Sequence, residues 1–379
     1  MTLGSGVGTS GRHFQRTVGS GVGTRLLRTA AVLILVATTA AQAQRSAPPP
    51  SAARAADSPV PPLLAAAVRE GDALPRLHSL LVSQRGTVLV ERYFHGTRAT
   101  RLANVKSVAK SVISALVGVA VARGVIPSVR EPIGTYFGDL LRAPSDAPKR
   151  AITVEDLLTM RSGLETTSNR NYGAWVRSPN WVRFALAQPL LTPPGTAMDY
   201  STGSTHLLSA ILTRATRKTT LQFAQEVIGT PLGFSVAPWT RDPQGIYFGG
   251  NDMAMTPRQM LAFGDLYLHE GRVGATQVLP AQWIRDSWVP RGRSLRGDRD
   301  DREYGYGWWI RTLAGQRTYY AWGFGGQFIF VVPALELVVV TTSSTVTDDE
   351  RRAHRRTVNE LVESLVIAPL AEAQSNSSR

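Results

Sequence analysis

Two residues near the start of a predicted helix have the types and the spacing for acyl-transfer chemistry. Ser107 and Lys110 lie three positions apart, so on a helix their side chains share one face, about a turn apart. A serine hydroxyl becomes a nucleophile when a neighbouring base removes its proton. Burial in this apolar helix, together with the positive end of the helix dipole, should lower the pKa of Lys110 toward that of a usable base. The helix start also offers the Ser107 N–H as a donor to an oxyanion.

Other hydrolytic chemistries lack the residues that they need. The 379-residue chain has no cysteine, which excludes thiol catalysis, disulfides and cysteine metal sites, and its six histidines include no pair at metal-ligand spacing. We therefore expect no metal and no organic cofactor. The Gly-x-Ser-x-Gly pattern of α/β-hydrolases is absent, whereas Ser107-Val-Ala-Lys110 is the only Ser-x-x-Lys sequence. The net charge of +14 is mostly scattered arginine, without a nucleic-acid-binding module, so nucleic acid is not an expected partner.

The N-terminus has the pattern of a leader that is removed. Residues 25–28 supply positive charge, residues 30–37 form a short apolar run, and Ala41-Gln42-Ala43 is a small-x-small cleavage site. We expect residues 1–43 to be a signal peptide cleaved after Ala43, which predicts a secreted or periplasmic protein without stable membrane insertion. An uncleaved anchor is the alternative, but the apolar run is short for a membrane span. A translation start downstream of the Gly/Ser-rich first twenty residues is also open.

The rest of the chain is expected to form one composite domain of the α/β class, in its α+β form. After a Pro/Ala-rich linker at residues 44–62, the folded domain should cover residues 63–368 and precede a disordered tail at 369–379. Strand patterns occur at residues 78–94, 304–311, 317–322, 327–332 and 335–341, and helical patterns at 107–123, 153–160, 205–215, 220–227, 256–267 and 351–366. Strands at both ends predict one antiparallel sheet built from both termini, flanked by helices, with a mostly helical insertion at about 125–300.

Four segments, in this order, resemble the serine β-lactamase-like hydrolases: Ser107-Val-Ala-Lys110, Leu157–Leu164, Pro194–Ser201 and Trp322–Pro333. This group includes class C β-lactamases, their esterase relatives, DD-peptidases and 6-aminohexanoate-oligomer hydrolases. The resemblance covers about residues 75–366 and is nearest to the esterase and oligoamide-hydrolase branch. It implies a β-lactamase/DD-peptidase-like fold with a Ser-Lys-Tyr site.

The resemblance implies that Tyr200 is the third catalytic residue, whose phenol relays a proton to the leaving group. A tyrosine close to an ammonium should have its phenolate form favoured. A half-buried loop tyrosine without a catalytic role is the alternative reading of the sequence alone. The family often carries Tyr-x-Asn here, but this chain has Tyr200-Ser201-Thr202, so an asparagine that would contact a substrate amide is missing.

The third family motif, Lys/His-Thr-Gly, has two possible registers here, Ala321-Trp322-Gly323 and Phe324-Gly325-Gly326, and neither contains a lysine or histidine. The residue after the motif would supply the second oxyanion N–H, and we favour Phe324 over Gln327 because the preceding strand leads straight into it. Glycine at 323 lets the strand approach the substrate closely. The missing cation removes a clamp for a carboxylate, which argues against penicillins and peptidoglycan stems.

Two weaker candidates could contact the substrate. Trp181 lies in a loop before the tyrosine and could form a wall of the acyl pocket, although ordinary core packing is the simpler explanation. Asn251 follows two glycines and could cap a turn instead.

These observations predict an acyl-serine hydrolase that acts on a small ester, an amide or a short oligomer. The alternatives are a weak β-lactamase or DD-peptidase, and a catalytically silent penicillin-recognising protein. No pattern indicates an oligomeric state.

Overall fold

The computed structural model describes residues 59–293 and 302–377. The predicted leader and most of the predicted linker lie outside these residues. The strands are β1 (Leu77–Gln84), β2 (Thr87–Tyr93), β3 (Ala103–Asn104), β4 (Ala254–Met255), β5 (Arg272–Val273), β6 (Thr276–Gln277), β7 (Gly292–Arg293), β8 (Glu303–Tyr304), β9 (Trp309–Leu313), β10 (Gln316–Gly323), β11 (Gln327–Val332) and β12 (Leu337–Ser343).

The helices differ widely in length. They are α1 (Ala65–Asp72), α2 (Ala109–Ala122), α3 (Gly134–Phe137), α4 (Ala147–Arg150), α5 (Val154–Leu158), α6 (Tyr172–Arg177), α7 (Trp181–Ala187), α8 (Thr202–Thr216), α9 (Thr220–Ala224), α10 (Pro257–Leu268), α11 (Ala281–Ser287), α12 (Glu350–Val362) and α13 (Ala368–Ser377). None of the helices within the described ranges is both long and apolar enough to cross a membrane.

The main sheet unites the two ends of the folded chain. Its eight strands lie in the order β2-β1-β12-β11-β10-β9-β8-β7, and each neighbouring pair is antiparallel. The early strand β1 pairs with the last strand β12, for example at Val82 and Val339. The predicted antiparallel sheet built from both chain ends is therefore confirmed.

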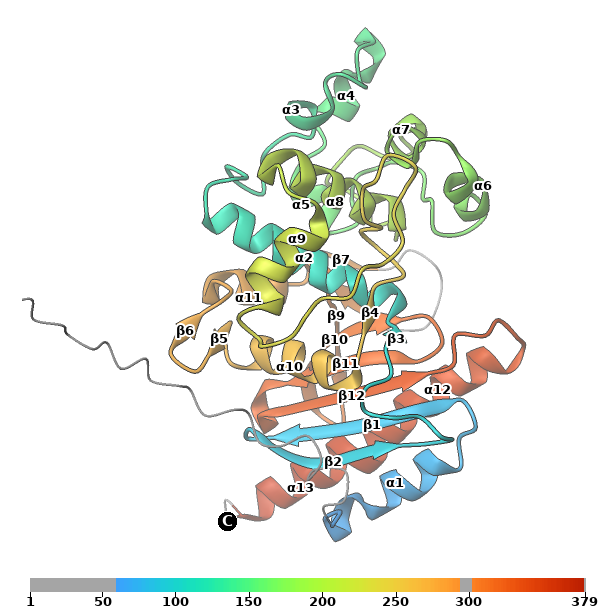
Figure 1. The fold of residues 1–379 in the computed structure, drawn as a ribbon, viewed down its shortest axis with the longest axis vertical. Coiled ribbons are helices and arrows are strands. Elements are labelled where there is room, and N and C mark those ends of the chain that lie inside the picture. The colour runs from blue at the N-terminus through green and yellow to red at the C-terminus, as the bar shows by residue number, and fades with distance from the viewer. Residues whose placement is uncertain (1–58, 294–301, 378–379) are drawn as a thin grey trace, which may run out of the picture. The chain divides into compact units, whose positions relative to one another are not determined.

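Both faces of the sheet are covered, which explains why β12 is so rich in valine. Val338 and Val340 pack in the core that contains α2 and α10, whereas Leu337 and Val339 pack with α1 and α12. This is the period of two expected of a strand between two apolar layers. Figure 1 shows α1, α12 and α13 on one side of the sheet and α2 and α10 on the other.

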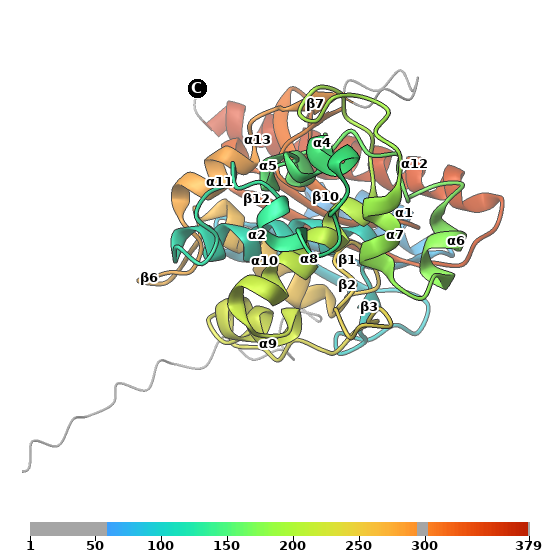
Figure 2. The ribbon, with the colours of Figure 1, turned by 90° about the horizontal axis from the view of Figure 1, so that it is seen from above.

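The inserted residues form a helical layer beyond α2. Figure 1 shows α3 to α8 gathered on the side of α2 away from the sheet, and Figure 2, from above, shows α2 and α8 close together, in agreement with their packing contacts. Helix α2 is buried along almost its whole length because the sheet, α8 and the inserted layer surround it. The first catalytic candidates therefore lie at the start of the most enclosed helix.

Three local predictions need correction. The single strand expected at residues 304–311 is two strands, because Gly305 lies against the Ser287 carbonyl and Gly307 adopts a left-handed φ of +77°. Trp181, expected to lie in a loop, is the first residue of α7. The tail expected to be disordered forms α13, whose Leu370 is buried.

Candidate active site

Ser107 lies in a short 3-10 turn, Lys106–Val108, that leads directly into α2. The turn leaves Ser107 half-buried at the helix entrance, while Lys110, in the first turn of α2, is only 1% exposed. The side chains meet as the sequence predicted, with 3.0 Å between Lys110 Nζ and Ser107 Oγ. The partly exposed hydroxyl of Ser107 thus lies next to the fully buried amine of Lys110.

The surroundings of Lys110 suit its neutral form. Burial lowers the pKa of its ammonium to about 7. Besides Ser107, Nζ lies 2.6 Å from the Gly250 carbonyl oxygen and 3.3 Å from Thr202 Oγ1. A neutral amine has two N–H groups and one lone pair. It can donate to Gly250 and Thr202 and still direct its lone pair at the Ser107 hydroxyl, which is the arrangement of a general base.

Tyr200 completes the group, but not with the electrostatics expected from the sequence. Its ring centre lies 4.9 Å from Lys110 Nζ, and the Ser107 side chain lies close enough to its phenol to influence the phenol's pKa. Burial raises the pKa of the phenol well above its usual range, although the contact with Ser107 lowers it in part. Tyr200 is therefore a neutral phenol at rest, able to give a proton rather than take one. Trp309 stacks on its ring with 5.6 Å between the ring centres.

Thr202 and Ser168 contribute hydroxyls that the sequence interpretation missed. Thr202 occupies the position where the family often has asparagine, and its hydroxyl is the one that faces Lys110 Nζ. Ser168 Oγ lies 2.7 Å from Thr202 Oγ1 and accepts the Thr202 N–H at 2.6 Å. The substitution of asparagine by threonine thus keeps a polar contact with the base. The motif pointed to the position of Thr202, but no sequence signal links Ser168 to it.

The third motif fits one of its two registers better. Gly323 is the last residue of β10, and a Cβ built on it would lie 2.2 Å from the Val105 carbonyl oxygen. Only glycine allows the strand to come this close to the turn that carries Ser107. Gly325 and Gly326 have φ of +89° and +110° and form the hairpin turn that follows. The geometry therefore favours Ala321-Trp322-Gly323 as the strand register.

Phe324 is then the residue that directly follows the glycine in contact with the Ser107 turn. Within the described residues, no acceptor takes the backbone N–H of Ser107 or of Phe324, so both amides remain available to an oxyanion. Gln327, the other candidate, is fully buried: its amide donates to the Ser343 carbonyl at 2.7 Å and accepts the Ser343 N–H at 3.1 Å. Its side chain holds β12 rather than facing solvent.

The two weaker candidates differ in their surroundings. Trp181 is 5% exposed, packs against Trp175 and Phe248, and donates its indole N–H to the Val176 carbonyl at 3.2 Å, which are the contacts of a core residue. Asn251 borders the site, because it follows the glycine whose carbonyl meets the base. Its amide donates to the Tyr172 hydroxyl at 2.8 Å.

Arginines outside the third motif bring positive charge to it. The guanidinium of Arg351 lies 4.3 Å from the ring centre of Phe324, and those of Arg355 and Arg302 lie 4.9 and 5.2 Å from that of Trp322. The sequence argument that the site lacks a cation therefore holds for the motif itself and not for its surroundings.

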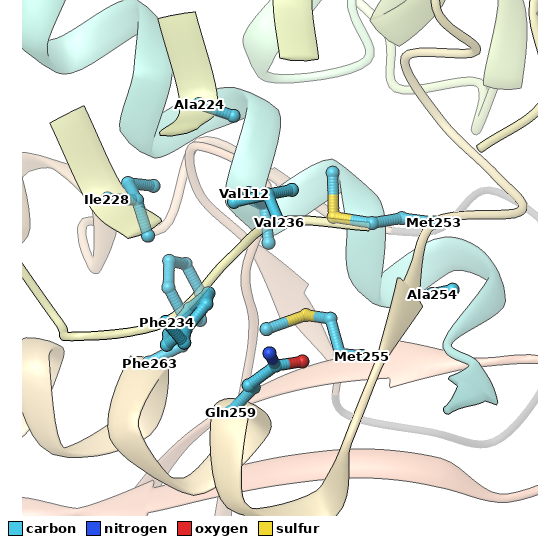
Figure 3. Close-up of a pocket in the computed structure, with 10 residues that line it drawn as sticks. All are labelled: Val112, Ala224, Ile228, Phe234, Val236, Met253, Ala254, Met255, Gln259 and Phe263. Atoms are coloured by element: carbon cyan, nitrogen blue, oxygen red, sulfur yellow. The ribbon is translucent and has the colours of Figure 1, made fainter. Parts of the chain in front are cut away.

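An apolar hollow on another side of α2 is not the reaction site. Figure 3 shows its lining residues, which are Val112, Ala224, Ile228, Phe234, Val236, Met253, Ala254, Met255, Gln259 and Phe263. They include no nucleophile and no base. Elsewhere in the described chain, no three His, Asp or Glu residues are grouped so that they could hold a metal ion.

A serine at a helix entrance with a buried lysine one turn later, on an antiparallel sheet covered by helices, defines the serine acyl-transfer hydrolases with a Ser-x-x-Lys motif. The sequence profile of the Beta-lactamase family matches residues 64–363, so the chain belongs to this family and is a hydrolase. A comparison with curated proteins found no match.

Solved structures share the fold at low sequence identity. A Bacillus anthracis protein described as a 6-aminohexanoate-dimer hydrolase has a TM-score of 0.64 and 22% identity, over 78% of this chain and 81% of that one. A penicillin binding protein from Bacillus halodurans has 0.60 and 15%, over 78% and 98%. A family VIII carboxylesterase has 0.60 and 17%, over 80% and 98%. The predicted family, fold and enzyme class are thereby confirmed, while the roles of single residues stay predictions.

Proposed function

We propose that the protein hydrolyses an ester or amide bond of a small molecule or short oligomer through an acyl-enzyme on Ser107. The observation that carries the proposal is the 3.0 Å contact between Ser107 Oγ and the enclosed Lys110 Nζ, whose pKa is lowered to about 7. The carboxylesterase and the 6-aminohexanoate-dimer hydrolase among the structural neighbours support this range of substrates.

In the proposed reaction, Ser107 Oγ attacks the carbonyl carbon while Lys110 Nζ takes its proton. The oxyanion accepts hydrogen bonds from the N–H groups of Ser107 and Phe324. When the tetrahedral intermediate collapses, the leaving group departs with the proton of the Tyr200 phenol, which regains one from the Lys110 ammonium. A water molecule then attacks the acyl-serine, and the same groups move its proton in reverse.

Labelling with a fluorophosphonate, read by intact mass and peptide mapping, tests the nucleophile, with Ser107→Ala as control. We expect one adduct, located on Ser107. A folded wild-type protein that stays unlabelled would contradict the proposal.

A second experiment ranks the substrates: p-nitrophenyl esters, linear amides and nitrocefin are compared with the wild-type enzyme. We expect esters and amides to be turned over faster than nitrocefin, because the third motif has no lysine or histidine to clamp a carboxylate. Faster nitrocefin turnover would favour the weak β-lactamase alternative. A stable penicillin adduct without any turnover would identify a silent binding protein.

We also propose that the mature protein is secreted or periplasmic. The support is the charged, apolar and small-x-small pattern that ends at Ala43. N-terminal sequencing of the protein expressed with its own leader should give a start at Gln44. An intact leader in the membrane fraction would show that the segment is an anchor.

A further inference from the structure

Two non-glycine residues in left-handed backbone conformations face each other beside the proposed site. Lys106 has φ of +52° and Asp252 has φ of +59°. Residues with a side chain avoid this region unless the surrounding structure holds them there, and such residues gather at functional sites. Lys106 Nζ and Asp252 Oδ1 are joined by an ion pair of 2.9 Å, with the two side chains 22% and 25% exposed.

Asn104 ties this ion pair to the main chain. The Asn104 side-chain amide donates through Nδ2 to the same Asp252 Oδ1 at 2.8 Å. Its side-chain oxygen Oδ1 accepts the backbone N–H of Lys106 at 3.0 Å. Strands β3 and β4 hold the two segments together, and the Val105 N–H donates to the Met253 carbonyl at 2.9 Å. The left-handed turn is thus fixed by several polar contacts on one side.

The other side of the turn is closed by the sheet. Because β10 lies against the Val105 carbonyl at Gly323, the turn has no free space in that direction. The dihedral angles of Lys106 set the plane of the peptide that carries the Ser107 N–H. Two residues before Asp252, the Gly250 carbonyl meets Lys110 Nζ at 2.6 Å. Both halves of the ion pair are therefore next to a group that the reaction uses.

We propose that the Lys106–Asp252 ion pair is a positioning device for the acyl-transfer step. It holds Lys106 in the left-handed conformation that aims the Ser107 N–H at the oxyanion, and it keeps the Gly250 carbonyl on Lys110. Neither residue takes part in the chemistry itself. The inference rests on the proposed acyl-serine reaction, since it assigns the two residues a role in that reaction only.

The chain offers a matched control far from the site. Arg85 and Glu336 are also left-handed, with φ of 51° and 48°, and they too form an ion pair, 3.5 Å long, with the side chains 59% and 62% exposed. Arg85 lies in the turn between β1 and β2, and Glu336 in the turn before β12. Arg85→Met removes the same kind of pair without touching the Ser107 turn.

The test measures kcat and KM for p-nitrophenyl butyrate and the rate of fluorophosphonate labelling in variants at 106 and 252. We expect Lys106→Met and Asp252→Asn each to lower kcat and the labelling rate about tenfold or more, with KM within about twofold, because a misdirected oxyanion donor weakens the transition state more than substrate binding. The double variant should be little worse than either single one, since the two residues act as a unit.

Two rescues separate positioning from general stability. Lys106→Arg keeps the ion pair and should retain most of the activity. Lys106→Gly removes the pair but accepts a left-handed φ, so it should lose less activity than Lys106→Met. Arg85→Met should keep wild-type kcat.

The outcomes also separate this inference from the proposed function. A wild-type enzyme that is not labelled at Ser107 overturns both. Normal wild-type labelling with unchanged kcat in Asp252→Asn, whose shape is almost that of the native residue, overturns only the positioning role. Equal losses in Lys106→Met and Arg85→Met would show a general effect on stability and would also overturn it.

Discussion

The pH dependence of Ser107 acylation tests the proposed base directly. Lys110 has its pKa lowered by burial from the ordinary 10.5 to about 7. At pH 7 about half of the molecules then carry a neutral amine, against roughly one in 3,000 for an ordinary lysine. Only the neutral amine accepts the Ser107 proton. We therefore expect the labelling rate to rise with pH, with a midpoint near 7 and a plateau by about pH 8.5.

Neighbouring groups leave this pH window clear. The pKa of Tyr200 is raised by burial, so the phenol stays neutral. His354, on α12 below the Gly326 turn, has its pKa lowered to about 4 by burial and by Arg76, so it does not change charge between pH 5.5 and 9 either. A midpoint near 7 that is lost in Lys110→Arg thus reports on Lys110.

The assay is single-turnover fluorophosphonate labelling from pH 5.5 to 9.5, with circular dichroism to show that the protein stays folded. Lys110→Arg is the control, because a guanidinium does not lose its proton in this range, and it should lower the rate on the order of 10²–10⁴-fold at every pH. A rate that is independent of pH, or a midpoint above 9.5, would refute the assignment of Lys110 as the base.

Three further variants test other parts of the site. Lys110→Met should raise the free energy of unfolding at pH 7, because holding a lysine with a pKa of about 7 instead of 10.5 costs up to ~4 kcal/mol there. This cost falls as pH rises from 7 to 10.5, so the gain in Tm of the variant should shrink over that range. A gain in Tm that grows with pH would contradict this origin. Thr202→Val removes a hydrogen-bond acceptor that favours the ammonium form of Lys110, so the pH midpoint of acylation should move lower. Thr202→Ser keeps the hydroxyl and should leave the midpoint unchanged. A midpoint that moves to higher pH in Thr202→Val would contradict the role of Thr202 as an acceptor for Lys110. Gly323→Ala places a methyl group 2.2 Å from the Val105 carbonyl oxygen and should lower both Tm and kcat. The control is Gly173→Ala, whose methyl group meets only the movable end of an arginine side chain and should change neither value. An unchanged Tm and kcat in Gly323→Ala would show that the close approach of β10 to Val105 is not needed.

The sequence predicted the parts of the molecule whose information is local. The Ser107–Lys110 pair could be found because helix spacing alone brings the two side chains together. The sheet could be predicted because valine-rich and aromatic runs such as Leu337–Ser343 have the composition of buried strands at both ends of the chain. The break at Gly305–Gly307 escaped, since a glycine pair inside an aromatic run gives no sign of whether the strand continues.

The contacts that tune the base could not be predicted, because they join residues that are distant in the sequence. Ser168 reaches Thr202 across 34 positions, and the Gly250 carbonyl reaches Lys110 across 140. Hydroxyl and carbonyl partners of this kind leave no periodic pattern. The sequence argument about Tyr200 went wrong for a related reason: it weighed the charge of the nearby lysine, whereas burial raises the pKa of the phenol and leaves the lysine largely uncharged above pH 7.

Substrate preference illustrates the same limit on a larger scale. The sequence places no lysine or histidine in the third motif, and a carboxylate clamp seemed to be lost with it. The fold brings Arg351 and Arg355 of α12 to the aromatic side chains of this motif from about thirty residues further along the chain. A guanidinium that lies on an aromatic ring keeps its charge. Positive charge therefore lies beside the motif but not in it, and the ranking of p-nitrophenyl esters with neutral and carboxylate-bearing acyl chains measures whether this charge helps an anionic acyl group to react. Equal turnover of both in the wild type and in Arg351→Met would show that these arginines only support the aromatic side chains.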